Sequence, residues 1–240
     1  YTMGFLLPEI LLPFKAQRGL PSEIVGGYEA RHHPRPYMAH LGITGGTNCV
    51  GFLVAPQWVM TAAHCEGNYT VTLGAHNISA EEPSRQVFSI EANYPHPEYD
   101  GSTTSNDIHL LKLNSKATLN KYVQILRLPK SNRYLSNGTP CSVAGWGGVY
   151  KDWAPTTLYE TNIAISGCSR NGNPYPDLND GKVCAGRLDN PETGDSGGPL
   201  VCDGVAEGIV SNGNPCPPAV YTRVGHYLPW IKETMKKHSQ

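Results

Sequence analysis

Three short strings of the sequence contain side chains that together could carry out nucleophilic catalysis. They stand at residues 61–65 (TAAHC), 106–111 (NDIHLL) and 194–200 (GDSGGPL). A serine hydroxyl is a poor nucleophile at neutral pH, so an imidazole must take its proton during attack and later pass it to the leaving group. A carboxylate that accepts a hydrogen bond from the other ring nitrogen would orient that imidazole. The strings therefore predict Ser196 as nucleophile, His64 as general base and Asp107 as orienting carboxylate. The other histidines, among them His76 and His109, are interpreted as ordinary surface or capping residues.

The elements that must hold these residues are predicted to be short strands. Apolar and β-branched runs of about 4 to 8 residues alternate with Gly, Pro, Asn and Asp clusters, as in a β-barrel or a β-sandwich. Such runs cover residues 51–54, 69–73, 108–113, 161–165 and 208–210. Helical periodicity is clear only near the end, where Tyr227, Leu228, Ile231 and Met235 share one face and Pro229 falls in the first turn. We therefore expect an all-β fold with one C-terminal helix.

The composition of the 240-residue chain argues against several classes of protein. It has 19 Lys plus Arg, 20 Asp plus Glu and a formal net charge of -1, with 39% hydrophobic and 16% charged residues. Such a chain can bury a core and is neither disordered nor a coiled coil. Near-zero charge argues against nucleic-acid binding, and no apolar run approaches the ~20 residues of a membrane-spanning helix. We expect no nucleic-acid partner, no membrane span and no cofactor.

Seven cysteines indicate a disulfide framework. Because the chain has no CxxC pair and no Cys/His cluster at zinc spacing, no metal site is expected and secretion into an oxidising compartment is favoured. An odd number leaves at least one cysteine free or paired outside the chain. Sequons at Asn68, Asn77 and Asn137 agree with secretion, since each could carry a glycan on a surface loop, but sequons also arise by chance.

Residues 1–23 differ from the rest and are interpreted as a leader or propeptide that is removed. Their apolar run at 5–14 has the length of a signal peptide, although an acidic residue interrupts it and no Ala-x-Ala site follows. A polar connection at residues 115–130 suggests a boundary later in the chain. We expect residues 24–124 to form an N-terminal unit and residues 125–240 a C-terminal one.

Two more strings, 24–27 (IVGG) and 144–147 (AGWG), complete a set of five motifs in which the order is His, Asp, Ser. From Ile24 to its end the chain resembles the serine proteases of the trypsin/chymotrypsin fold, and other triad folds use other orders. The resemblance implies two packed antiparallel six-stranded β-barrels with a C-terminal α-helix. It also implies a serine endopeptidase that works through the His64, Asp107 and Ser196 triad and an acyl-enzyme intermediate.

Further roles follow from the same resemblance. The backbone N–H groups of Gly194 and Ser196 would form the oxyanion hole, which stabilises the negative charge that develops on the substrate carbonyl. Asp195 would pair with the α-amino group of Ile24 and so order that hole. This amine exists only after cleavage behind Glu23, so we expect a zymogen.

Within this family, the strings 35–39 (RPYMA), 71–78 (VTLGAHNI) and 217–223 (PPAVYTR) are most similar to the mast-cell chymases and granzymes. This branch implies a secreted or granule-stored monomer that acts on peptides and proteins and is bound by protein inhibitors. It also implies three disulfides, Cys49–Cys65, Cys141–Cys202 and Cys168–Cys184. Cys216 is then left over, either as a free thiol beside the substrate pocket or as an inert buried one.

The loop before the nucleophile leaves the substrate preference open between two alignments. An alignment counted back from Ser196 without a gap places Asn190 at the pocket floor, with Ser211, Gly213 and Ala219 along the wall. An uncharged floor with these wall residues suits a large apolar or aromatic substrate side chain. An alignment shifted by one residue places Asp189 at the pocket floor instead, and a buried carboxylate there would select Lys or Arg. The first alignment is simpler and is favoured.

Two functions from other classes stay open. A protease fold can serve as a binding protein, although such proteins lose triad residues and this chain has all three. A granule protein acting by charge on proteoglycans or microbial membranes would need a strongly cationic surface, and the net charge of -1 argues against it.

Overall fold

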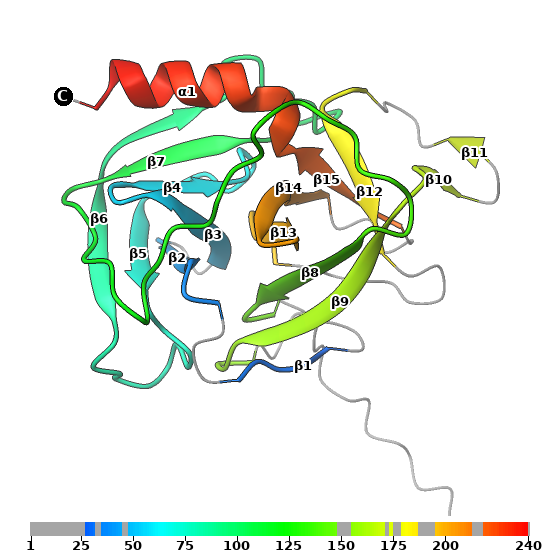
Figure 1. The fold of residues 1–240 in the computed structure, drawn as a ribbon. Helices are drawn as coiled ribbons and strands as arrows, with labels where there is room; N and C mark the ends of the chain where they lie inside the picture. The colour runs from blue at the N-terminus through cyan, green and yellow to red at the C-terminus, as the bar shows by residue number, and fades with distance from the viewer. Residues whose placement is uncertain are drawn as a thin grey trace, which may run out of the picture.

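Two β-barrels and one helix make up the part of the chain that the computed structural model describes (Figure 1). The described residues are 27–31, 35–44, 48–147, 155–170, 173–174, 179–186, 195–212 and 218–239. The expected all-β class, the two six-stranded barrels and the C-terminal helix are confirmed. Within these residues no helix has the length and apolarity needed to cross a bilayer.

The first barrel is closed by six antiparallel strands in the order β2-β3-β4-β7-β6-β5. These strands are β2 (Met38–Ile43), β3 (Asn48–Ala55), β4 (Trp58–Thr61), β5 (Tyr69–Leu73), β6 (Gln86–Pro95) and β7 (His109–Leu113). Strand β5 shows why they form: Tyr69, Val71 and Leu73 are buried, while Thr70 between them is exposed. This alternation buries one face of β5 in the core of the barrel.

The second barrel closes because β9 pairs with both β8 and β12. Its strands are β8 (Pro140–Gly145), β9 (Tyr159–Ser166), β12 (Lys182–Ala185), β13 (Pro199–Cys202), β14 (Val205–Asn212) and β15 (Ala219–Arg223). A short ribbon, β10 (Ser169–Arg170) with β11 (Asn173–Pro174), stands beside them. A smaller apolar cluster that includes Met38, Val50 and Trp146 draws on both barrels and fills the seam between them.

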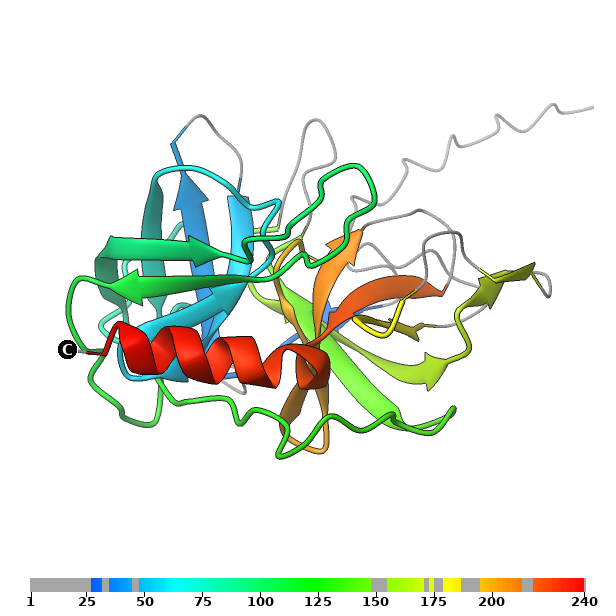
Figure 2. The same cartoon turned by 90° about the horizontal axis from the view of Figure 1, so that it is seen from above.

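Each end of the described chain packs on the barrel that is farther from it in sequence. Strand β1 (Tyr28–Glu29) precedes the first barrel in sequence but pairs with β9 of the second. The 3₁₀ turn η1 (Val224–Tyr227) and helix α1 (Leu228–Lys237) follow the second barrel but pack on the core of the first through Val224, Tyr227 and Ile231. Figure 2 shows α1 running along the first barrel.

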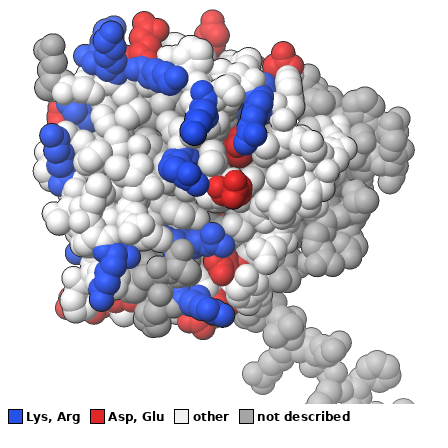
Figure 3. Space-filling view, viewed as in Figure 1, with Lys and Arg blue, Asp and Glu red and all other residues white. Residues whose placement is uncertain are grey.

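The segment 114–139 joins β7 to β8 and crosses one face of both barrels (Figure 1). It carries no acidic residue and five basic ones, all exposed: Lys116, Lys121, Arg127, Lys130 and Arg133. Lys and Arg side chains lie across this face in Figure 3, with acidic side chains scattered among them. The net charge of -1 therefore hides an uneven distribution of charge.

Candidate active site

His64 lies in the turn that follows β4. The Cys65 N–H closes this turn by donating to the Ala62 carbonyl at 3.2 Å, and the disulfide Cys49–Cys65 ties it to β3. The side chain of His64 is 28% exposed, so one edge of its ring reaches solvent while the backbone is fixed. This is the placement that a general base for an external substrate requires.

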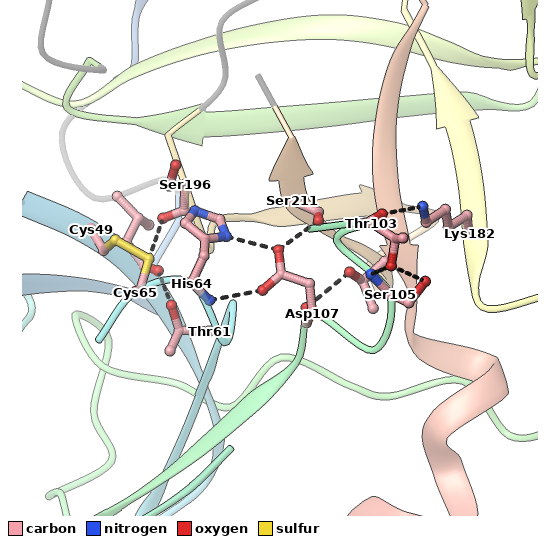
Figure 4. Close-up of polar contacts among 12 residues, drawn as sticks. Cys49, Thr61, His64, Cys65, Thr103, Ser105, Asp107, Lys182, Ser196 and Ser211 are labelled. Carbon is pink, nitrogen blue, oxygen red and sulfur yellow. Dashed lines mark hydrogen bonds and ion pairs between the residues drawn. A yellow bond between two sulfur atoms is a disulfide. The ribbon is translucent and has the colours of Figure 1, made fainter. Parts of the chain in front are cut away.

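Asp107 lies directly before β7 and is fully buried. Its Oδ2 accepts a hydrogen bond from His64 Nδ1 at 2.7 Å, and its Oδ1 accepts one from the His64 backbone N–H at 2.9 Å. The Ser211 hydroxyl, from β14, donates to the same Oδ2 at 2.5 Å, and the Thr222 hydroxyl, from β15, donates to the Asp107 backbone carbonyl at 2.9 Å. Figure 4 shows donors from both barrels converging on this one carboxylate.

The contact between Asp107 and His64 fixes the protonation of the ring. A carboxylate only accepts hydrogen bonds, so Nδ1 of the neutral imidazole must carry the proton and Nε2 is left as an acceptor. A ring in this tautomer can take a proton from a hydroxyl at Nε2. The imidazolium that results is stabilised by the buried carboxylate behind it.

A sharp backbone turn places Asp107 at the seam. Asn106 has a φ of 57°, in the left-handed region that asparagine tolerates better than most residues. The Tyr227 hydroxyl donates to Asn106 Oδ1 at 3.1 Å, and Asn106 Nδ2 donates to the Glu98 carbonyl at 2.7 Å. The C-terminal part of the chain therefore helps to hold the loop that carries the carboxylate.

Ser196 lies in the turn before β13, beside the His64 ring (Figure 4). The turn needs glycine at 197, where φ is 83° and a Cβ would stand 2.1 Å from Thr61 Oγ1 and 2.3 Å from the Val50 carbonyl oxygen. No hydrogen bond joins the Ser196 hydroxyl to His64 in the described part of the chain. Such bonds commonly tighten only when substrate binds.

A second buried carboxylate, Asp195, stands next to the serine. Its Oδ2 accepts a hydrogen bond from the Gly147 N–H at 3.0 Å, and a Cβ on Gly145 would lie only 1.8 Å from the same oxygen. Burial raises the pKa of Asp195 to about 7, and the backbone N–H groups of Gly147 and Trp146 offset only part of that rise. Among the described residues no cation contacts this carboxylate.

The other predicted site residues fall into two groups. Ser211 and Ala219 are buried in β14 and β15, and the Ser211 hydroxyl is turned to Asp107. Six predicted residues lie outside the described residues: Ile24, Asp189, Asn190, Gly194, Gly213 and Cys216.

The cysteines and sequons are also placed. Sulfur–sulfur bonds join Cys49 to Cys65, Cys141 to Cys202 and Cys168 to Cys184, which are the pairings that the resemblance implies. Asn68 and Asn137 are exposed, and Asn77 is half-buried. No group of three or more Cys, His, Asp or Glu side chains within the described ranges is arranged to hold a metal ion.

The interpretation of His76 and His109 as surface or capping residues is wrong, because they are 2% and 3% exposed. His109 lies in the wall of the first barrel, where burial lowers its pKa to about 4. It therefore stays neutral at physiological pH and does not compete with His64 for the charge of Asp107. The sequence of β7 contained a signal, since residue 109 lies on the same strand face as Leu111 and Leu113, and all five residues of β7 are buried.

Sequence reasoning missed two residues that hold Asp107, Thr222 and, in this role, Ser211, and also Tyr227, which holds the neighbouring Asn106. All three come from the second barrel or the turn behind it, more than a hundred positions away in the sequence. No local pattern marks such distant partners.

Comparisons with known proteins agree with this geometry. The family model described as Trypsin matches residues 24–231. Human granzyme H is 44% identical over 95% of this chain and 98% of its own length, and human cathepsin G is 43% identical over 96% and 93%. Mast cell protease 2 of Meriones unguiculatus is 40% identical over 98% and 100%.

The solved structures give the same result. One described as "Structure of GrC" superposes with a TM-score of 0.80 at 42% identity, over 88% of this chain and 99% of that one. Its coverage and that of the curated relatives extend over both barrels. The chain therefore belongs to the trypsin family of serine endopeptidases, among the granzymes, chymase-like mast-cell proteases and cathepsin G.

Proposed function

We propose that this endopeptidase cleaves peptide bonds with Ser196 as nucleophile, His64 as general base and Asp107 as the residue that orients the base. The observation that carries the proposal is the 2.7 Å contact of His64 Nδ1 with the fully buried Asp107 carboxylate, which leaves Nε2 facing away from it. The His64 ring lies beside Ser196 at the seam between the barrels (Figure 4).

The reaction proceeds in two halves. Ser196 Oγ attacks the substrate carbonyl carbon as its proton passes to His64 Nε2, and the backbone N–H groups of Gly194 and Ser196 stabilise the oxyanion. His64 then gives the proton to the leaving amine, so the C–N bond breaks and an acyl-enzyme remains. Water repeats the sequence in place of the serine hydroxyl and releases the acid product.

Activation depends on the other carboxylate. Removal of residues 1–23 as a leader or propeptide creates an α-amino group on Ile24, which pairs with Asp195 and orders the neighbouring oxyanion hole. Two features support this role: Asp195 is buried with only backbone donors among the described residues, and β1 is already paired to β9 a few residues after Ile24. The chain is thus made as a zymogen.

The proposed substrate preference is for large apolar or aromatic side chains. It rests on the alignment that assigns Asn190 to the pocket floor and Ala219 to the wall; Ala219 is a small residue buried in β15. The alternative floor residue, Asp189, would select Lys or Arg. Peptides that differ only in Phe, Leu, Lys or Glu before the cleaved bond distinguish the two: a preference for Phe or Leu supports Asn190, and a preference for Lys contradicts it.

The triad itself is tested by an organophosphonate that reacts with activated serines. The full chain, cut behind Glu23, is expected to gain the reagent's mass on Ser196, whereas the uncut chain is expected to react slowly. The matched control is Ser196→Ala, which removes the nucleophile and is expected to lower kcat on the order of 10⁶-fold, as in other triad proteases. A folded, cut protein that gains no label would instead be a binding protein with a protease fold.

A further inference from the structure

A cavity of about 340 Å³ opens in the second barrel and shares no residue with the His64, Asp107 and Ser196 site. Its apolar wall is formed by Leu135, Ile165, Val183 and the disulfide between Cys168 and Cys184. The volume lies at the lower end of the ~300–1,000 Å³ range of small-molecule sites. Nothing in the proposed peptidase mechanism uses it.

One residue at the edge of this cavity is Asn137, the acceptor of the sequon Asn137-Gly138-Thr139. The sequon forms a tight turn in which the Thr139 N–H donates to the Ser136 carbonyl at 3.1 Å and Gly138 has a φ of 83°. The Gly138 N–H donates to the Ile165 carbonyl at 2.8 Å and so fixes the turn against β9. Asn137 itself is exposed, and its side chain makes no hydrogen bond to a described residue.

The amide nitrogen of Asn137 is directed over the end of β9. A Cβ built on Gly167 would have Asn137 Nδ2 at 4.0 Å, and no other atom of the described residues within that distance apart from its own chain neighbours. Gly167 lies between Ser166 and Cys168, which both line the cavity. The missing side chain at 167 therefore leaves open space between the nitrogen that would bear a sugar and the cavity wall.

The cavity also offers polar partners that suit a sugar. Ser166 lines the cavity, and its Oγ, which is shielded from solvent, has no hydrogen-bond partner among the described residues. The Arg133 side chain is 65% exposed, and its guanidinium stands 3.6 Å from the buried Glu207 carboxylate. A pyranose ring presents apolar C–H groups on one face and hydroxyl and acetamide groups around its rim, which complements an apolar wall with hydrogen-bonding groups at its edge.

We propose that Asn137 is N-glycosylated and that the first N-acetylglucosamine of the glycan lies in this cavity. In the attachment step, the bond between C1 of the sugar and the diphosphate of a lipid-linked oligosaccharide breaks and C1 bonds to Asn137 Nδ2. One amide proton leaves with the released lipid diphosphate. Because the sugar is then tethered at the cavity edge, its effective concentration is of millimolar order, and weak contacts are enough to hold it there.

The other two sequons differ from Asn137 in their surroundings. Asn68 is exposed but does not line the cavity, which makes it the matched control. Asn77 is half-buried, and its Oδ1 accepts a hydrogen bond from the Ser79 N–H at 2.9 Å. Neither residue lines this cavity, so a glycan on either is expected to extend into solvent.

The test measures glycan occupancy and protection on the full chain secreted from mammalian cells. Glycopeptide mass spectrometry is expected to find Asn137 occupied, and a peptide N-glycosidase is expected to release this glycan from the folded protein at least tenfold more slowly than a glycan placed at Asn68. After denaturation the two rates should be equal. An unoccupied Asn137, or equal release rates in the folded protein, would overturn the proposal.

Two variants distinguish a glycan whose first sugar packs in the cavity from a glycan that is only attached to Asn137. Gly167→Val places a side chain where the sugar must pass, and is expected to keep Asn137 occupied but to bring its release rate up to that of Asn68. Asn137→Gln removes the glycan and is expected to leave kcat/KM on a short peptide within twofold of the parent, which shows that the variant is folded. Unchanged protection in Gly167→Val would contradict the assigned cavity.

Discussion

Asp107 and Asp195 are both buried, at 0% and 5% exposure, yet their surroundings differ. Asp107 accepts hydrogen bonds from the His64 ring, the His64 backbone and the Ser211 hydroxyl. Asp195 has only the backbone N–H groups of Gly147 and Trp146 among the described residues, and burial raises its pKa to about 7. A buried carboxylate is costly unless donors or a cation compensate for the water it has lost.

The different surroundings of the two carboxylates suit different functions: Asp107 orients the catalytic base, whereas Asp195 takes part in the proposed activation of the enzyme. The donors to the Asp107 carboxylate are His64 and Ser211, so under the proposed activation the base needs no group that cleavage releases. The surroundings of Asp195 lack a cation among the described residues, and the amine that the proposed cleavage releases is one. Proteolysis would then change the second carboxylate and leave the first as it is.

Among changes that distinguish the two buried carboxylates, the largest expected effect comes from removing the charge of Asp107. Asp107→Asn keeps the size of the side chain but presents an amide to His64 Nδ1, so the ring is held in the wrong tautomer. We expect kcat to fall about 10⁴-fold, as is typical of this substitution in triad proteases. Steady-state kinetics on the activated protein check this, with the circular dichroism spectrum as the control for folding. A loss smaller than tenfold would mean that Asp107 does not orient the base.

The next effect is on stability in the uncleaved chain. Because burial raises the pKa of Asp195 to about 7, the folded state holds this proton more tightly than the unfolded chain does. The protonated Asp195 contributes fully to the free energy of unfolding below about pH 4. This contribution, up to about 4 kcal/mol, is lost as the pH rises to 7. Urea unfolding between pH 4 and 8 measures the slope. Asp195→Asn should remove this part of the slope, and identical slopes in the two proteins would mean that Asp195 is not its source.

A third expectation concerns Asp195 after cleavage. Asp195→Asn leaves the new amine of Ile24 without its charged partner, and breaking a buried ion pair costs about 3–5 kcal/mol. We expect activity of the cleaved protein to fall by at least 100-fold, while the uncleaved variant is no less stable at pH 8 than the parent. Kinetics and urea unfolding on both forms check this. Full activity in the cleaved variant would remove Asp195 from the activation step.

The smallest expected effect comes from Ser211, whose hydroxyl is one of three hydrogen-bond donors to the Asp107 carboxylate. Ser211→Ala removes the 2.5 Å hydrogen bond and leaves the two contacts from His64. A hydrogen bond to a charged group contributes about 1.5–3 kcal/mol, so kcat should fall roughly tenfold to 100-fold with little change in KM. Steady-state kinetics on the activated Ser211→Ala protein measure kcat and KM separately, and an unchanged kcat would mean that this hydroxyl does not support Asp107.

Local patterns predicted more of the fold than of the site's support. The run 69–73 coincides with β5, and the run 108–113 overlaps β7, because alternating or continuous apolar residues mark strands directly. The helical stripe from Tyr227 begins one residue before α1, since Tyr227 still belongs to the preceding 3₁₀ turn. The two closed barrels were expected only from the resemblance, because the pairing of β9 with β8 and β12 joins residues far apart in sequence.

The candidate site shows the same division. The motifs marked His64, Asp107 and Ser196, but nothing in them indicated that Ser211 and Thr222 would reach Asp107 from the other barrel. Those contacts depend on how two closed sheets pack, which no window of the sequence encodes.

The exchange of chain ends between the barrels has a mechanical consequence. Separating the barrels along the seam that holds His64 and Ser196 requires β1 to leave β9 and α1 to leave the first barrel. The ends of a chain normally unfold locally with a small change in free energy. Here each end of the described chain packs on the opposite barrel. We therefore expect the two barrels to lose their structure together, so that the geometry of the seam lasts as long as the fold itself.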